Sequence, residues 1–481
     1  MAVELSRLRC WLSLIIDEPV DKKKENWGIE NLPNLDFKFV CVNTLIGLPK
    51  MVEDSLGTSA EDFEKLIQLR TEFFTASAKR KIKIEQEFKA LQNHIAEKQR
   101  EWSTKNTEAV TMLINWNPFK VDETAWFDPF WMFGVNEGFD IAIGNPPYGA
   151  SYPEKDKKHF KQYYVSAQTK NGLKGSLDTF SLFIEKSFVT LSNNSFLTFI
   201  VPLAVTSSDS LSSLHNLLLK NCEKIAVSTY SNRPKKIFDN ADQRVAILFF
   251  HKNNQPIKYL LTTKVNKRYE DTSIEDLISS LSFVNSIGFI QFGRLPKVGN
   301  EIELSILKKI FSIKSIIKNL LLNDGEQIYY RTSGGRYYNI ITNFSTGSSK
   351  ESFITVNKEI RDVLAAVLSS NLYYWFYHIY SNTLDLKTYE LEIFPVPIER
   401  LLDKKEKIER LYMEYLNDLY KNSKIKNVNY AHTKEYREYY ARKSKHIIDK
   451  IDLEIKNTYG FTDEEVNFII NYDLKFRTDD E

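Results

Sequence analysis

The chain has 481 residues, of which 42% are hydrophobic and 27% charged, so it is long enough for two or three globular domains. Its formal net charge of only +2 excludes a uniformly basic chain, and DNA affinity would need local basic surfaces. The cysteines Cys10, Cys41 and Cys222 form no CxxC pair, and the sequence has neither zinc-ligand spacing nor a membrane-length apolar run. We therefore expect a cytoplasmic protein with reduced thiols, no metal site and no membrane partner.

The first hundred residues predict a helix, a strand and a helical hairpin. Residues 2–16 carry a helical stripe of apolar side chains at Leu5, Leu8, Leu12 and Ile15. Residues 35–45 alternate apolar and polar side chains, which predicts a strand that ends at Asn43. Residues 56–104 are dense in Glu, Lys, Gln and Ala, and their two apolar stripes predict a pair of antiparallel helices.

Residues 139–148 read FDIAIGNPPY and form the corner around which the chain is organised. The uncharged run 141–143 suits a fully buried strand, and the two prolines forbid its continuation. The corner therefore holds the Asn145 amide, the Pro146 carbonyl and the Tyr148 ring at the carboxyl end of a strand. Open α/β sheets bind their ligands at that edge.

An amide oxygen, a carbonyl oxygen and a flat ring together suit an exocyclic amino group on a planar base. The two acceptors draw the amino group toward tetrahedral geometry and localise its lone pair, while the aromatic ring stacks on the base. The simpler interpretation is an Asx-Pro turn after a core strand, which is a common structure.

The segment after the corner predicts a polar loop and then an alternation of helices and strands. Residues 149–176 are polar and basic, which is typical of a mobile loop over a site. Residues 177–186 predict an amphipathic helix that contains Phe183. The next elements are predicted as strand, helix and strand, at 196–205, 211–219 and 225–230.

A basic loop around Phe238 precedes a predicted strand at 245–250. Its cationic side chains are Lys235, Lys236 and Arg244. An aromatic side chain between basic residues suits a base held out of the duplex, and base stacking contributes roughly 1–3 kcal/mol. An ordinary Phe that anchors the loop is the alternative.

From residue 290 the composition changes. Arg331 and Arg336 flank a Thr-Ser-Gly-Gly run, and arginine is the usual bidentate reader of guanine. Residues 365–376 predict an aromatic-rich helix, most of whose rings we expect in a core. Residues 401–481 are helical and charged in pattern, with phosphate contact as the alternative to a solvated bundle.

The Asn145-Pro146-Pro147-Tyr148 corner, set after Gly-Phe-Asp-Ile-Ala-Ile-Gly, resembles the catalytic motif of the N6-adenine DNA methyltransferases. More narrowly, the chain resembles part of the type IIG restriction–modification enzymes. The order of Arg331, the aromatic helix and Ile393-Phe394-Pro395 is similar to their target recognition domain. The resemblance implies methyl transfer from S-adenosylmethionine to a flipped adenine in double-stranded DNA.

The resemblance also assigns roles. Asn145 and the Pro146 carbonyl accept from the adenine amino group, and Phe238 stacks opposite Tyr148. Asn43 and Phe183 match positions that contact the cofactor. The DNA-contacting candidates are Lys235, Lys236, Arg244, Arg331 and Arg336.

The implied fold is α/β, with a doubly wound S-adenosylmethionine-dependent methyltransferase core that lacks its first strands. A helical insertion, an α+β target recognition domain and a helical C-terminal tail complete it. The expected segments are a partial core at 1–55 and 105–255, the insertion at 56–104, a connector at 256–289, the recognition domain at 290–400 and the helical region at 401–481.

No Gly-rich cofactor loop occurs before Asn145, where the resembled family has one, so we expect an incomplete cofactor site. A separate upstream polypeptide could supply the loop and a nuclease. The alternative is a catalytically inactive, sequence-specific DNA-binding fragment. Methylation of RNA or of protein glutamine is a remoter alternative, because those enzymes share the corner motif.

Overall fold

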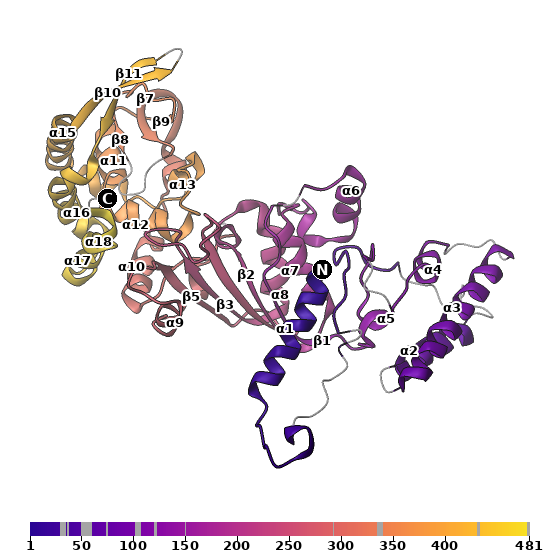
Figure 1. Ribbon diagram of the computed structural model, residues 1–481. Coiled ribbons are helices and arrows are strands. Elements are labelled where there is room, and N and C mark those ends of the chain that lie inside the picture. Colours follow the sequence, from indigo (N-terminus) through magenta and orange to yellow (C-terminus); the bar gives the residue numbers. More distant parts are fainter. Residues whose placement is uncertain are drawn as a thin grey trace. The chain divides into compact units, whose positions relative to one another are not determined.

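The computed structural model describes residues 1–28, 35, 38–49, 60–73, 76–101, 107–119, 123–149, 151–291, 293–333, 340–430 and 433–478. The chain forms two compact units, and unit 1 comprises residues 1–141 and 182–195. Unit 2 comprises residues 142–181 and 196–481. The fold is mixed α/β with a central mixed sheet and a largely helical C-terminal region, as predicted (Figure 1).

Unit 1 is mainly helical. Its helices are α1 (Ala2–Asp17), α2 (Ala60–Phe73), α3 (Ala78–Glu101), α4 (Thr107–Ile114) and α5 (Pro129–Phe133), and most of α7 (Thr179–Thr190) also belongs to it. The short helix α5 starts where the Asp128 side chain accepts a hydrogen bond from the Trp131 backbone N–H at 2.9 Å. It ends at Gly134, whose φ of 73° is the left-handed conformation that closes many helices.

Helices α2 and α3 confirm the predicted helical pair of the insertion. Phe63 and Leu66 of α2 and Phe88 of α3 are buried in one apolar cluster with Trp131. At one end of the pair, the Arg80 guanidinium donates to Glu72 and to Glu87, each at 2.7 Å. Burial of apolar side chains therefore contributes most of the stability of the helix pair, and the exposed ion pairs add little.

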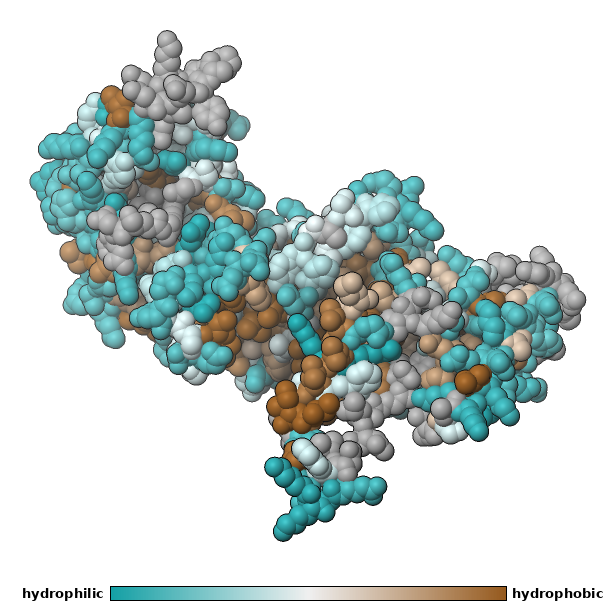
Figure 2. All heavy atoms as spheres, viewed as in Figure 1, coloured by the Kyte–Doolittle hydropathy of each residue, from teal (hydrophilic) through white to brown (hydrophobic). Residues whose placement is uncertain are grey.

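Helix α1 has the predicted bounds, but its apolar side is exposed. The side chains of Leu5, Leu8, Leu12, Ile15 and Ile16 are all exposed in the described structure. Figure 2 shows this hydrophobic surface along the helix. A contiguous exposed apolar surface of this kind commonly marks an interaction site.

The central sheet has six strands in the order β1-β2-β4-β3-β5-β6. Strand β3 pairs antiparallel with β4 and parallel with β5, and β5 pairs antiparallel with β6. The segment 256–289, predicted as a connector, supplies β5 and β6 to this sheet. The strands are β1 (Phe139–Gly144), β2 (Leu191–Pro202), β3 (Cys222–Tyr230), β4 (Val245–Lys252), β5 (Tyr259–Asn266) and β6 (Val284–Asn285).

The prediction that residues 141–143 form a fully buried strand is wrong. Ile141 is 61% exposed and Ile143 is 79% exposed. Strand β1 is the edge strand of the sheet in the described part of the chain, and the sheet face that carries Ile141 and Ile143 is left exposed there. Apolar composition suits a strand with neighbours on both sides, whereas this edge carries unpaired backbone groups.

Residues 149–176 were expected as a loop, but they contain the helix α6 (Glu154–Tyr163). Phe160 is the buried residue of α6, and its ring packs edge-on against the Tyr152 ring at 4.9 Å. A single buried aromatic side chain therefore anchors α6, and most of its other residues are charged or polar. Such a sequence is also typical of a polar loop.

The remaining helices of unit 2 surround the sheet and a second core. They are α8 (Ser212–Asn221), α9 (Ile274–Ser279), α10 (Glu301–Phe311), α11 (Arg361–Leu368), α12 (Asn371–Tyr380), α13 (Thr388–Glu392), α14 (Ile398–Leu402), α15 (Lys405–Lys421), α16 (Lys445–Tyr459), α17 (Asp463–Asn471) and α18 (Leu474–Thr478). A small sheet has the order β8-β7-β9, and a hairpin of two further strands interrupts the C-terminal helices. These strands are β7 (Leu321–Arg331), β8 (Ile341–Thr342), β9 (Glu351–Val356), β10 (Ser423–Tyr430) and β11 (Thr433–Tyr439).

Helix α12 is the centre of this second core, because all ten of its residues are buried. One cluster joins its rings to side chains of α10, α11, α15, α16 and α17. The carboxylate of Asp452 on α16 accepts from the backbone N–H groups of Asn371 and Leu372, each at 3.0 Å. These bonds satisfy two N–H groups that the start of a helix leaves without intrahelical partners.

The carboxyl group of Glu303 in this core should make the stability of the fold depend on pH. Its oxygens accept from Gly299 N–H at 2.8 Å and from the Trp375 indole at 3.2 Å, and burial raises the pKa of Glu303 to about 7. A raised folded pKa contributes stability that is present below the unfolded pKa and is lost as pH rises through about 7.

We therefore expect the free energy of unfolding to fall by a few kcal/mol, as an order of magnitude, from this group between pH 4.5 and 7.5. Urea unfolding of the protein and of its Glu303→Gln variant over this range measures the effect. The difference between the two proteins isolates Glu303 from other titrating groups, including Asp452. If the difference in the free energy of unfolding between the two proteins does not change with pH, the raised pKa of Glu303 is contradicted.

Candidate active site

The Asn-Pro-Pro-Tyr corner lies at the carboxyl end of β1, as predicted. Gly144 lets the chain pass close to β2, because a Cβ atom at this position would lie 3.0 Å from the Phe199 ring and the ring would have to shift. Beyond it, Asn145 is exposed, Pro146 is buried and Tyr148 is half-buried. The Asn145 side chain makes no hydrogen bond to another described residue, so its amide is available to a ligand.

Tyr148 and Phe238 lie in the same apolar cluster. The cluster is built on the buried side chains of Tyr230, Val245 and Leu277, and both rings pack against it. The Tyr148 hydroxyl donates to the Ile200 carbonyl at 3.0 Å, and burial raises the pKa of Tyr148. This bond fixes the ring beside β2. Two aromatic side chains 90 residues apart in the sequence therefore pack against the same apolar cluster.

The predicted cofactor residues belong to unit 1. The predicted strand at 35–45 is wrong for the described residues 38–45, where Val42 and Thr124 form only an isolated parallel bridge. Asn43 is exposed, and its Oδ1 accepts from Leu45 N–H at 3.2 Å, which is a turn closed by the asparagine's own side chain. Phe183 is half-buried on α7.

The predicted DNA-contacting residues that the structure describes lie in two different environments. Lys235 pairs with Glu270 at 2.9 Å, and Lys236 lies 4.0 Å from Asp242. Arg244 and Arg331 both line one cavity. Arg336 lies outside the described residues.

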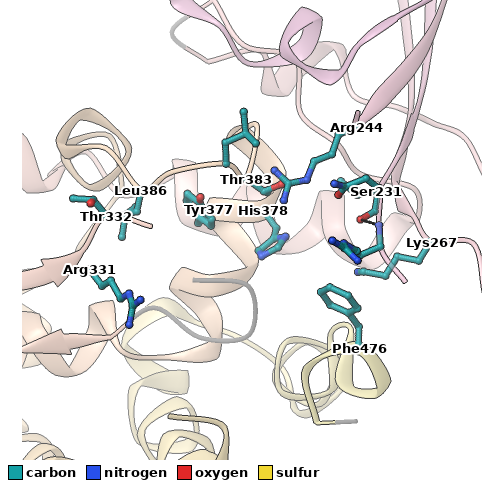
Figure 3. Close-up of a pocket in the computed structure, with 14 residues that line it drawn as sticks. Ser231, Arg244, Lys267, Arg331, Thr332, Tyr377, His378, Thr383, Leu386 and Phe476 are labelled. Atoms are coloured by element: carbon teal, nitrogen blue, oxygen red, sulfur yellow. Dashed lines mark hydrogen bonds between the residues drawn. The ribbon is translucent and has the colours of Figure 1, made fainter. Parts of the chain in front are cut away.

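This cavity lies in unit 2 and has a volume of about 260 Å³. Figure 3 shows that side chains from the ends of β3, β5 and β7, from the start of β4 and from α12 and α18 surround it. Sequence reasoning missed most of these residues, because they come from six separate segments. The described lining residues are Ser231, Asn232, Arg233, Arg244, Val265, Lys267, Arg331, Thr332, Tyr377, His378, Thr383, Leu384, Leu386 and Phe476.

Within the described residues, no group of three or more His, Cys, Asp or Glu side chains is placed to hold a metal ion. None of the helices formed by these residues is long and apolar enough to cross a membrane.

Comparison with known proteins relates the N-terminal half of the chain to restriction–modification enzymes. Residues 1–238 match the Eco57I restriction-modification methylase family. The chain is 26% identical over 209 residues to the type II restriction enzyme and methyltransferase RM.Eco57I of Escherichia coli. This similarity covers 42% of the chain and 20% of the Escherichia coli protein, so the chain spans only about a fifth of that relative.

Two solved structures are also similar. The type IIL restriction–modification enzyme MmeI, solved in complex with DNA, is 15% identical with a TM-score of 0.37 over 70% of this chain and 57% of MmeI. The type IIG restriction endonuclease BpuSI is 8% identical with a TM-score of 0.28 over 77% of this chain and 58% of BpuSI.

The family match covers the Asn-Pro-Pro-Tyr corner, both predicted cofactor residues and Phe238. The match of residues 1–238 to the Eco57I restriction-modification methylase family therefore confirms the predicted resemblance to restriction–modification methyltransferases.

Proposed function

We propose that the chain is the adenine-N6 DNA methyltransferase portion of a type IIG restriction–modification enzyme. The observation that carries this proposal is the rigid corner at Asn145, with Tyr148 and Phe238 packed in one cluster beside it. An amino group has two N–H donors, and this corner offers an amide oxygen and a backbone carbonyl to receive them. We assign DNA recognition to residues 290–400, while residues 256–289 supply β5 and β6 of the central sheet.

In this reaction Asn145 and the Pro146 carbonyl accept the two hydrogen bonds from the adenine amino group. Their pull localises the nitrogen lone pair. The nitrogen would then bond to the methyl carbon as the carbon–sulfur bond of the methyl donor breaks, and one amino proton would leave to solvent. Tyr148 and Phe238 hold the base by stacking, which offsets the few kcal/mol that flipping costs. S-adenosylmethionine supplies the methyl group when bound, with Asn43 and Phe183 as the proposed contacts.

The described residues fit this cofactor only in part. The Asn43 Oδ1 is already bonded to Leu45 N–H, and Phe183 offers one half-buried ring. Neither residue supplies the cluster of backbone donors that usually holds a cofactor's charged groups. We therefore propose that a further polypeptide completes the site.

The alternative function is a catalytically inactive, sequence-specific DNA-binding fragment that needs an upstream chain. The exposed edge of β1 favours a missing partner, because Ile141 and Ile143 present apolar side chains beside unpaired backbone groups. The exposed apolar side of α1 favours it as well.

Titration calorimetry with S-adenosylmethionine, followed by a methylation assay on duplex DNA, tests the proposal. We expect very weak cofactor binding and no methylation by the chain alone. Addition of the polypeptide encoded directly upstream should restore both and yield N6-methyladenine.

The outcomes separate the two functions. Micromolar cofactor binding by the chain alone would mean that its site is complete. Specific DNA binding without N6-methyladenine in the complemented assembly would favour the DNA-binding fragment.

A further inference from the structure

The cavity lined by Arg244 and Arg331 is cationic. Its described lining residues include Arg233, Arg244, Lys267 and Arg331, and none of the 14 is an aspartate or glutamate. If these arginines and the lysine only stabilised contacts within the fold, carboxylates would be expected to line the cavity beside them. An excess of one sign around a cavity favours a ligand of the opposite sign.

Acidic groups nearby neutralise this charge only in part. Asp473 pairs with the Lys267 ammonium, which also lies 4.5 Å from the centre of the Phe476 ring. The Asn232 side chain donates to Asp242 and lowers its pKa, and the charges of Lys236, Arg233 and Arg244 lower it further. The Arg331 Nε donates to the Ser333 carbonyl at 2.7 Å, which orients its guanidinium plane.

His378 supplies an independent indication of a ligand. This residue of α12 is only 8% exposed, and its Nε2 has no hydrogen-bond partner among the described residues. Burial lowers the pKa of His378 well below its ordinary value, and Lys267 and Arg244 lower it further. A buried polar atom without a partner is unfavourable, and a ligand oxygen at this wall would satisfy it.

The cations lie at two ends of the cavity. Figure 3 shows Arg244 and Lys267 extending toward His378 at one end, while Arg331 lies at the opposite side, beyond Tyr377. Tyr377 lies between the two ends and offers a ring and a hydroxyl, and Thr332 offers a second hydroxyl on the side of Arg331 (Figure 3). A single small anion would occupy one end, whereas a chain of linked anions would reach both.

We propose that this cavity binds phosphate groups, and that its two cationic ends receive two phosphates of one nucleic-acid strand. The choice of a strand rests on the proposed function, because the corner at Asn145 needs a nucleic-acid substrate in the same unit. Arg244 and Arg331 then position the backbone and do not read bases. Free phosphate or pyrophosphate would offer the same anionic oxygens and is the alternative ligand.

Fluorescence anisotropy of a labelled duplex over a range of salt concentrations tests the proposal with the whole chain. Arg244→Gln and Arg331→Gln should each reduce the slope of log K against log salt by about 0.9, and the double variant by about 1.8. The loss should be uniform across duplex sequences. Lys314→Gln removes an exposed cation of the same unit that does not line the cavity, so it should leave the slope unchanged.

Calorimetry with inorganic phosphate and with pyrophosphate distinguishes the two sources. Pyrophosphate binding that the double variant abolishes, with an unchanged DNA slope, would assign the cavity to a free phosphate compound. An unchanged slope together with no phosphate or pyrophosphate binding would overturn the proposal, as would a loss confined to one base position. If neither the parent protein nor any variant binds duplex DNA, the proposed function is wrong. The pyrophosphate titration then still shows whether the cavity binds phosphate groups.

Discussion

Asn145→Ala is expected to abolish most methyl transfer while leaving the affinity for duplex DNA nearly unchanged. In the proposed reaction, the substitution removes one of the two acceptors that bind the adenine amino group as its lone pair localises. Loss of one preorganised polar group that stabilises a transition state typically lowers kcat by about 10²–10³-fold. Because Asn145 is exposed and bonds to no other described residue, the fold should not change.

The measurement is methyl transfer by the complemented assembly under single-turnover conditions, with anisotropy for DNA affinity. Asn145→Asp retains an acceptor oxygen and should keep much more activity than the alanine variant. Asn467→Ala, an exposed asparagine on α17, is the matched control and should behave as the parent protein. Near-normal methylation by Asn145→Ala would refute the role of this residue.

Trp375→Ala is expected to destabilise unit 2 by about 3–5 kcal/mol, the usual range for deletion of a large buried aromatic. The Trp375 side chain is fully buried in α12, and its indole N–H donates to Glu303 at 3.2 Å. The substitution both opens a cavity and removes a donor from a buried carboxyl group.

Urea unfolding of the two proteins measures the loss. Tyr163→Ala on α6 is the matched control, because that aromatic is 63% exposed in the same unit. Its free energy of unfolding should change far less. Equal midpoints for Trp375→Ala and the parent protein would show that this core does not limit stability.

Local patterns predicted much of this fold. The apolar stripe of residues 2–16 gives α1, and the strands ending at Gly144, Pro202 and Tyr230 lie where alternation and turn residues place them. The corner could be predicted because proline restricts the backbone whatever surrounds it. Helix formation along 60–73 and 78–101 likewise depends on the spacing of apolar residues within each segment.

Features that depend on distant segments could not be predicted. The exposure of Ile143 depends on which segments cover its face of the sheet, and the sequence of β1 carries no sign of them. The hairpin of β10 and β11 interrupts a run that is rich in Lys and Tyr, where helix was expected. Lys267 and His378 are 111 residues apart, and only the fold places both on the wall of one cavity.

The burial of α12 has a consequence for any attempt to exchange residues 290–400, the proposed recognition segment, between related chains. Its side chains belong to one apolar cluster with those of α10, α11, α15, α16 and α17, so residues 290–400 share their interior with the helices that follow. A graft of 290–400 alone would place these rings against a foreign surface and leave Asn371 and Leu372 without the Asp452 carboxylate. An exchangeable cassette would have to run from about Val284 to Tyr472, the limits of that shared interior.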